Sequence, residues 1–235
     1  MSKSNLISPI KNLIENEFKE KFVLFCGAGI SKSSGLPLAN ELKTFILKNL
    51  SYNELDIQKE VDEIIRSKLP FESFMESILT TTNNFDILDV FRFAKPNTNH
   101  KLIAKLAKIG YLNIIVTANF DLLIEEAFKQ EKLKRNEHYF VHFRGKHFSK
   151  KAFENYDLNK IHLFKIHGSI EDKDSIKTTL SAVANKSNSE DISFLMNYLL
   201  STGNHKNILV LGYSFNDIFD INPLIKKKYN RHYID

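Results

Sequence analysis

Small and polar residues gather in one short stretch of this 235-residue sequence, FCGAGISKSSGLP at residues 25–37. It holds Gly27, Gly29 and Gly35, three of the chain's eight glycines, directly after an apolar run. Glycine permits a tight turn and close approach of backbone N–H groups to an anion, so the stretch favours a pyrophosphate site. The third glycine comes too late for the usual G-x-G-x-x-G fingerprint. A turn that needs positive φ is the simpler alternative.

Three further polar segments also follow apolar runs: TANFD at 117–121, HGS at 167–169 and GYSFND at 212–217. The amide of Asn119 can grip a ribose hydroxyl and a water together, and His167 can remove a proton near neutral pH. Each residue also has an ordinary explanation. Asn119 can cap a helix, Asp121 can lie in its first turn, His167 can be a hydrogen-bonded core residue, and Ser214 with Asp217 can be another cap. Their occurrence together favours a ligand site.

Apolar patterns predict the elements that position these segments. Buried strands are expected at four places: 22–26, 112–117, 161–166 and 208–211. One amphipathic helix is expected before the first strand, at 5–19. Others are expected between the strands: a helix from Pro37 to about 49, 99–109, 121–128, and one through Ile192, Leu195, Met196 and Leu199. This alternation predicts an α/β fold with a Rossmann-like, doubly wound parallel sheet. In such sheets ligands bind beyond the carboxyl ends of the strands, where all four polar segments lie.

We expect one domain over residues 1–235, with a helical insertion at 51–95 whose apolar residues recur every three to four positions. Residues 131–160 have weak periodicity, and we interpret them as a peripheral hairpin or a mobile lid. His138 and His142 lie four positions apart in that region, but no metal motif accompanies them, so no metal is expected.

Composition narrows the class of protein. Hydrophobic residues make up 43% and charged residues 26%, which is typical of a folded globular chain and excludes a largely disordered one. No apolar run is long enough for a membrane span or a secretory signal, so we expect a cytoplasmic protein without membrane contact. The net charge is +5, but the basic clusters at 129–135 and 226–228 lack interleaved aromatic residues. Direct nucleic-acid binding is therefore not expected.

The four segments, taken in order, resemble the sirtuin-like NAD-binding domains. The resemblance rests on GAGIS-x-x-SGLP at 27–37, TANFD at 117–121, IHGS at 166–169 and GYSFND at 212–217. In detail the sequence is similar to the bacterial branch found in anti-phage defence proteins, where this domain hydrolyses NAD to nicotinamide and ADP-ribose. The resemblance implies NAD as the substrate and no metal.

The resemblance also implies roles for individual residues. The catalytic pair would be Asn119, which holds the nicotinamide ribose and the attacking water, and His167, the general base. Asp121 would contact the carboxamide. The remaining residues expected to contact NAD are Gly27, Ala28 and Gly29 at the pyrophosphate, Ile30 and Ser31 near nicotinamide, Gly168, and Gly212, Ser214 and Asp217 on the adenosine side.

Two departures from the family pattern bear on the reaction. Sirtuin deacylases carry a zinc module with four cysteines, whereas this chain has the single Cys26. The Asp-Phe-Arg segment usual after the glycine loop is replaced by Leu38-Ala39-Asn40-Glu41, and Ala118 stands where Gln is usual before the catalytic Asn. We therefore expect a fold without the zinc module and an NAD glycohydrolase.

Three alternatives stay open: a silent module that senses NAD or ADP-ribose, a deacylase and an ADP-ribosyltransferase. A toxic hydrolase must be restrained, so we also expect a regulatory partner protein or self-assembly into a homo-oligomer. The chain ends soon after the last motif, which leaves no room for a large sensor domain.

Overall fold

The computed structural model describes residues 22–50, 58–67, 69–82, 86–143, 156–157, 159–176, 192–198 and 208–214. The expected helix at 5–19, Asp217 and the basic run at 226–228 lie outside these ranges. Within them, no helix combines the length and the apolarity needed to cross a bilayer.

Five parallel strands form one sheet in the order β3-β4-β2-β1-β5. They are β1 (Phe22–Cys26), β2 (Leu112–Thr117), β3 (Tyr139–Phe143), β4 (Ile161–Lys165) and β5 (Ile208–Leu211). Every residue of β1 and β2 is buried, as expected for central strands covered on both faces. β1 lies between β2 and the edge strand β5, so strands that are far apart in the sequence are neighbours in the sheet.

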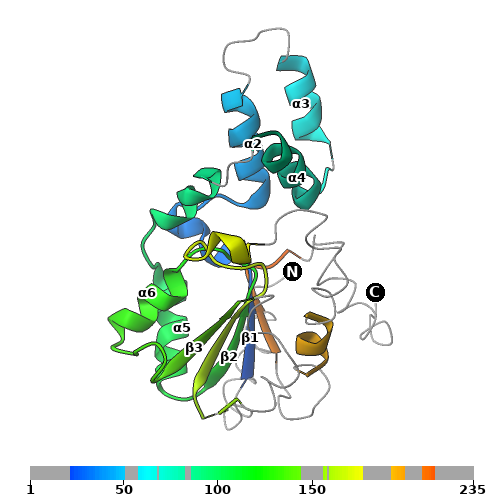
Figure 1. Ribbon diagram of the computed structural model, residues 1–235. Helices are drawn as coiled ribbons and strands as arrows, with labels where there is room; N and C mark the ends of the chain where they lie inside the picture. The colour runs from blue at the N-terminus through cyan, green and yellow to red at the C-terminus, as the bar shows by residue number, and fades with distance from the viewer. Residues whose placement is uncertain are drawn as a thin grey trace, which may run out of the picture.

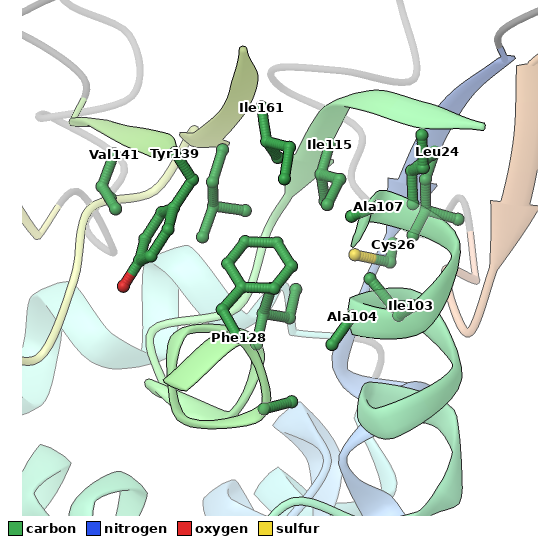
Figure 2. Close-up of a cluster of buried hydrophobic side chains, with 14 of the residues drawn as sticks. Leu24, Cys26, Ile103, Ala104, Ala107, Ile115, Phe128, Tyr139, Val141 and Ile161 are labelled. Atoms are coloured by element: carbon green, nitrogen blue, oxygen red, sulfur yellow. The ribbon is translucent and has the colours of Figure 1, made fainter. Parts of the chain in front are cut away.

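Helices α5 (Thr98–Lys108) and α6 (Leu123–Gln130) cover one face of the sheet (Figure 1). Figure 2 shows Phe128 of α6 pointing between Ile115 and Ile161 from two adjacent strands. The Phe128 ring meets that of Tyr139 edge to face, with centroids 4.8 Å apart. The single cysteine belongs to this core, where burial raises the pKa of the Cys26 thiol to about 12, so the thiol stays protonated.

The opposite face of the sheet is covered by the helix at 192–198. Ile192, Leu195 and Met196 of this helix pack against Val23 and Phe25 of β1 and their neighbours. With helices on both faces, the sheet is doubly wound and Rossmann-like, as the alternating pattern predicts.

A third apolar cluster lies beyond the carboxyl ends of the strands, in the lobe at the top of Figure 1. This lobe is built from α2 (Ala39–Leu50), α3 (Gln58–Arg66), α4 (Phe71–Thr82) and the 3-10 helix η5 (Asp86–Arg92). Ile170 and Ile176, which follow β4, are buried in the same cluster. The lobe therefore rests on the loop that carries the HGS segment.

The four predicted strands are confirmed, with β4 ending one residue earlier than expected. The interpretation of 131–160 as a hairpin or lid was wrong in its middle part, because Tyr139–Phe143 forms β3, the parallel edge strand of the main sheet. Its sequence, YFVHF, has a single aliphatic residue and lies in a stretch of weak periodicity. The prediction therefore missed this strand.

His142 has a different neighbour from the one that its sequence spacing suggests. Its Nε2 lies 3.0 Å from Nδ1 of His162 on the adjacent strand, and the two buried rings stack. Nε2 of His162 lies 2.9 Å from the Asp157 carbonyl and donates to it, so Nδ1 must accept from His142. Burial lowers the pKa of His162 more than this carbonyl raises it.

This geometry predicts a loss of stability in acid. Because the folded chain holds His162 neutral, the unfolded state binds more protons, and stability is lost as pH falls below the unperturbed value of about 6.5. In His162→Phe the pH dependence of the unfolding free energy between about pH 7 and 5 should shrink, by at most about 1.4 kcal/mol per pH unit. Urea titrations at each pH measure it.

The matched control is His138→Phe, because the side chain of His138 is 41% exposed. An unchanged slope in His162→Phe, or an equal change in both variants, would contradict the assignment.

Candidate functional site

The carboxyl ends of four strands meet in one place. Backbone hydrogen bonds continue beyond the strands and join their exits: Gly27 N to Leu211 O, Gly29 N to Gly212 O, Ala118 N to Cys26 O, Ile166 N to Thr117 O, and Ile170 N to Phe120 O. The segments quoted from the sequence are thus neighbours in space, although they are spread over nearly the whole chain.

The glycine loop consists of two short 3-10 turns, η2 (Ala28–Ile30) and η3 (Lys32–Ser34). The amides of Gly29, Ile30 and Ser31 donate to Gly212, Gly27 and Ala28 carbonyls, respectively. These three N–H groups therefore already donate to carbonyls of the protein. The expectation that backbone N–H groups of this loop face an anion does not hold for these three, because each already donates to a carbonyl, and the next α-helix, α2, begins only at Ala39.

Gly27 and Gly29 are needed for a contact with the end of β5. A Cβ added at Gly29 would lie 2.7 Å from Cα of Gly212, and one at Gly27 would lie 2.7 Å from the Tyr213 ring. Gly212 itself has a φ of +63° and touches the same loop. Two glycine turns therefore interlock, whereas the third glycine of the loop, Gly35, has a φ of +86° with open space around it and is a simple turn glycine.

Ser31 is the centre of a buried hydrogen-bond network. Its Oγ lies 2.8 Å from Oδ2 of Asp121, 3.1 Å from Nδ2 of Asn119 and 3.2 Å from Nε2 of His100. A hydroxyl has one proton and accepts only from donors. Because the Asp121 carboxylate can only accept, Ser31 donates to it, and the Asn119 amide and the His100 imidazole donate to Ser31.

His100 is a site residue that the sequence analysis missed. It lies in the first turn of α5 and is fully buried, with Nδ1 accepting from the backbone N–H of Asn97 at 3.3 Å. Asn97 in turn donates to the Ile30 carbonyl and to the Ser33 hydroxyl, both at 2.8 Å. The cap of α5 is thereby joined to the glycine loop. The signal is visible in the sequence as NTNH at 97–100, where the predicted helix at 99–109 begins.

Burial lowers the pKa of His100, and the nearby Asp121 carboxylate opposes that effect. Burial therefore favours the neutral imidazole, whose Nε2 faces the Ser31 hydroxyl and whose Nδ1 also lies 2.9 Å from Oδ1 of Asn97. A neutral donor at this point orients the hydroxyl without adding a charge.

Asn119 is 8% exposed, and its side chain is held by one end only. Nδ2 donates to Ser31, while the carbonyl oxygen Oδ1 is buried with no hydrogen-bond partner among the described residues. An unmatched buried acceptor costs about 1–3 kcal/mol and is typical of a group that serves a ligand. Asn119 does not cap a helix, since α6 begins at Leu123, where the backbone N–H bonds to Asp121 Oδ1 at 3.0 Å. Asp121 therefore precedes the helix that we expected to contain it.

His167 follows β4 just as Asn119 follows β2. Lys165 pairs with Thr117 in the sheet, so both residues lie two positions beyond a matched pair on adjacent strands. His167 is half-buried, whereas Ser169 is fully buried with an unpartnered Oγ. Gly168 has a φ of +89° and touches the backbone of Ser175, so no other residue fits this turn.

The other predicted contacts differ in exposure. Ala28, Gly29, Gly212 and Ser214 are exposed, while Gly27 and Ile30 are buried. Within the described ranges, no three His, Cys, Asp or Glu side chains gather as metal ligands.

The family model described as a SIR2-like domain matches residues 113–232, just over half of the chain. The chain belongs to the SIR2-like domain family. The matched range includes Asn119, His167 and Gly212, whereas the glycine loop precedes it.

The SIR2-like domain is also similar to curated proteins named NAD-dependent protein deacetylase. That of Clostridium perfringens is 32% identical over 122 residues, which is 52% of this chain and 45% of the relative. NAD-dependent protein deacetylase 2 of Caldanaerobacter subterraneus is 28% identical over 127 residues, 54% of this chain and 45% of the relative. The matches thus span less than half the length of these relatives.

Solved structures of Sir2 proteins are similar at low scores. A mutant Sir2 homologue in complex with ADP-ribose matches with a TM-score of 0.33 and 18% identity, over 72% of this chain and 48% of that chain. A structure concerned with the mechanism and regulation of Sir2 enzymes matches with a TM-score of 0.32 and 26% identity, over 51% and 42%.

The interlocked glycines of the SIR2-like domain generate a stability prediction. Gly212→Ala should lower the free energy of unfolding by about 3 kcal/mol or more, because strained φ and a backbone clash add up. Gly35→Ala is the matched control with positive φ and open space, and should cost only about 1–2 kcal/mol. Denaturant melts compare the two variants. Equal losses would show that the contact between the turns contributes nothing.

Proposed function

We propose that this SIR2-like domain is an NAD glycohydrolase, which cleaves NAD to nicotinamide and ADP-ribose. The observation that carries the proposal is the buried carbonyl oxygen of Asn119, which has no partner in the part of the chain that the structure describes and is held beside Ser31 at the carboxyl edge of a Rossmann-like sheet. An acceptor of this kind, next to a half-buried histidine on the adjacent strand exit, suits a sugar hydroxyl and a water.

The reaction breaks the bond between the ribose carbon and the pyridinium nitrogen. Nicotinamide leaves as a neutral molecule and needs no general acid, while the ribose carbon becomes oxocarbenium-like. Water then adds to that carbon, and its proton passes to a base and on to solvent. The protein must place the water and the base, which is a matter of orientation.

Asn119 would accept from the attacking water or a ribose hydroxyl through Oδ1. Its amide plane is fixed because Nδ2 already donates to Ser31, whose proton is committed to Asp121. His167 would act as general base, a role that typically contributes a factor of about 100 to 10,000. Asp121 would keep its predicted place near the carboxamide, although here one oxygen bonds Ser31 and the other the Leu123 amide.

The remaining predicted contacts would bind the rest of the dinucleotide. Gly27, Ala28 and Gly29 would lie along the pyrophosphate, Ile30 near nicotinamide, and Gly212 and Ser214 on the adenosine side. The exposed backbone of Ala28, Gly29 and Gly212 supports this proposal. Gly168 would shape the turn after His167, and the buried Oγ of Ser169 offers a second unmatched polar atom.

Deacetylation is the main competing activity, because the curated relatives are named NAD-dependent deacetylases. The single cysteine and the replaced residues Leu38–Glu41 favour hydrolysis. A role in bacterial anti-phage defence, through depletion of NAD in the cytoplasm, is part of the proposal.

Nicotinamide release from purified protein tests the proposal. Wild type should release nicotinamide and ADP-ribose from NAD without any peptide, and Asn119→Ala and His167→Ala should each lower kcat at least about 100-fold. Liquid chromatography follows both products. Asn49→Ala, in exposed α2, and His138→Ala are matched controls that should keep wild-type activity.

Three results would overturn hydrolysis. Release that requires an acetylated lysine peptide would show a deacylase. Label from NAD retained on polypeptide would show an ADP-ribosyltransferase. NAD binding without nicotinamide release, with any added protein or oligomer, would show a sensor.

We also propose that the activity is restrained through a partner protein or through self-association. Free NAD hydrolysis harms the cell that contains it, so the active form should require assembly. Specific activity should rise with protein concentration, or on adding a partner, in parallel with the mass measured by light scattering. A monomer that is fully active in dilute solution would contradict restraint.

A further inference from the structure

Lys165 is a fully buried lysine at the end of β4, with 0% of its surface exposed. It lies opposite Thr117 in the sheet and two residues before His167. Lysine is almost never fully buried unless its charge is paired, so its surroundings need an explanation.

The ammonium group of Lys165 donates to three oxygens. Nζ lies 2.9 Å from Oε1 of Glu125, 2.5 Å from the Asp121 carbonyl and 3.5 Å from the Phe120 carbonyl. Two of the three acceptors are therefore backbone carbonyls of the segment between β2 and α6. Asn119 lies directly before them in the chain.

The ion pair with Glu125 does not by itself explain this arrangement. Burial raises the pKa of Glu125, although the Lys165 ammonium lowers it. A buried ion pair repays its desolvation only partly and is weak evidence for stability. If two apolar side chains of the same volume replaced this ion pair, the hydrogen bonds to the two carbonyls would be lost.

We propose that Lys165 is a positioning residue, whose ammonium fixes the segment Asn119–Asp121 from below the ligand site. This inference rests on the proposed function for its effect on rate. Ser31 holds the side chains of Asn119 and Asp121, while Lys165 holds the backbone between them and their helix. The same lysine ends the strand that leads to His167, so it ties together the two strand exits that carry the reacting groups.

A double variant separates positioning from simple pairing. Lys165→Met alone leaves Glu125 buried without its cation, and the variant could fail to fold. Lys165→Met with Glu125→Leu removes both charges, so most of the stability should return. The carbonyls of Phe120 and Asp121 still lose their donor, and the segment should be looser.

Two measurements on the double variant follow from this. Hydrogen exchange of amides in residues 118–122 should speed up at least about tenfold relative to wild type, while exchange in β1 stays unchanged. kcat for nicotinamide release should fall about 10- to 100-fold with KM and the unfolding midpoint close to wild type, because misplacement by about 1 Å is costly.

The matched control is Lys43→Met. Lys43 is also buried, at 3% exposure, but among the described residues its Nζ bonds a single carbonyl, that of Ser67 at 3.5 Å, in the helical lobe. This variant should leave kcat and exchange at 118–122 unchanged.

The outcomes distinguish this inference from the proposed function. If wild type releases no nicotinamide, the proposed function fails, and exchange at 118–122 still decides the role of Lys165. Unchanged exchange in a folded double variant, or full kcat in that variant with an active wild type, would overturn the positioning role.

Discussion

The single proton of the Ser31 hydroxyl is the constraint on which the site depends. Asp121 must receive that proton, because a carboxylate has none to offer, and Asn119 and His100 must then act as donors. This settles which end of the Asn119 amide faces inward and which nitrogen of His100 carries hydrogen. The free end of the amide is the carbonyl oxygen, and no described residue satisfies it. The network thus creates one unmet acceptor and fixes its direction.

The sheet supplies the second constraint, since only parallel strands bring all the exits to one edge. The register Thr117 to Lys165 places the exits that lead to Asn119 and to His167 side by side. The interlocked turns at Gly29 and Gly212 likewise hold the exits of β1 and β5 together, and these two strands pair directly. These glycines serve protein contacts, so a ligand would meet a surface that is already rigid. Little ordering of the backbone would then be needed on binding.

The sequence could predict the four aliphatic strands and the segments beyond them, because buried parallel strands have a distinct composition. It could not predict β3, whose YFVHF pattern depends on a histidine pairing with His162 across the sheet. His100 was missed for a similar reason, since its partner Ser31 is 69 positions away. The alternative explanation of Asn119 as a helix cap does not hold, because its side-chain amide donates to Ser31, 88 positions away, and α6 begins only at Leu123. The sequence shows which side chains can form hydrogen bonds, whereas only the fold shows which partners they bond.

The segment Asn119–Asp121 is held from two sides by groups of opposite character. On the ligand side, the neutral hydroxyl of Ser31 orients the side chains. On the core side, the buried ammonium of Lys165 donates to the backbone. The ammonium of Lys165 also compensates the charge of the Glu125 carboxylate, which lies 2.9 Å from it beneath this segment. The arrangement therefore fixes geometry with strong interactions while leaving the Asn119 carbonyl oxygen unengaged. The proposed site must hold a water and a sugar in one orientation, and this requires both a rigid segment and one free hydrogen-bond acceptor.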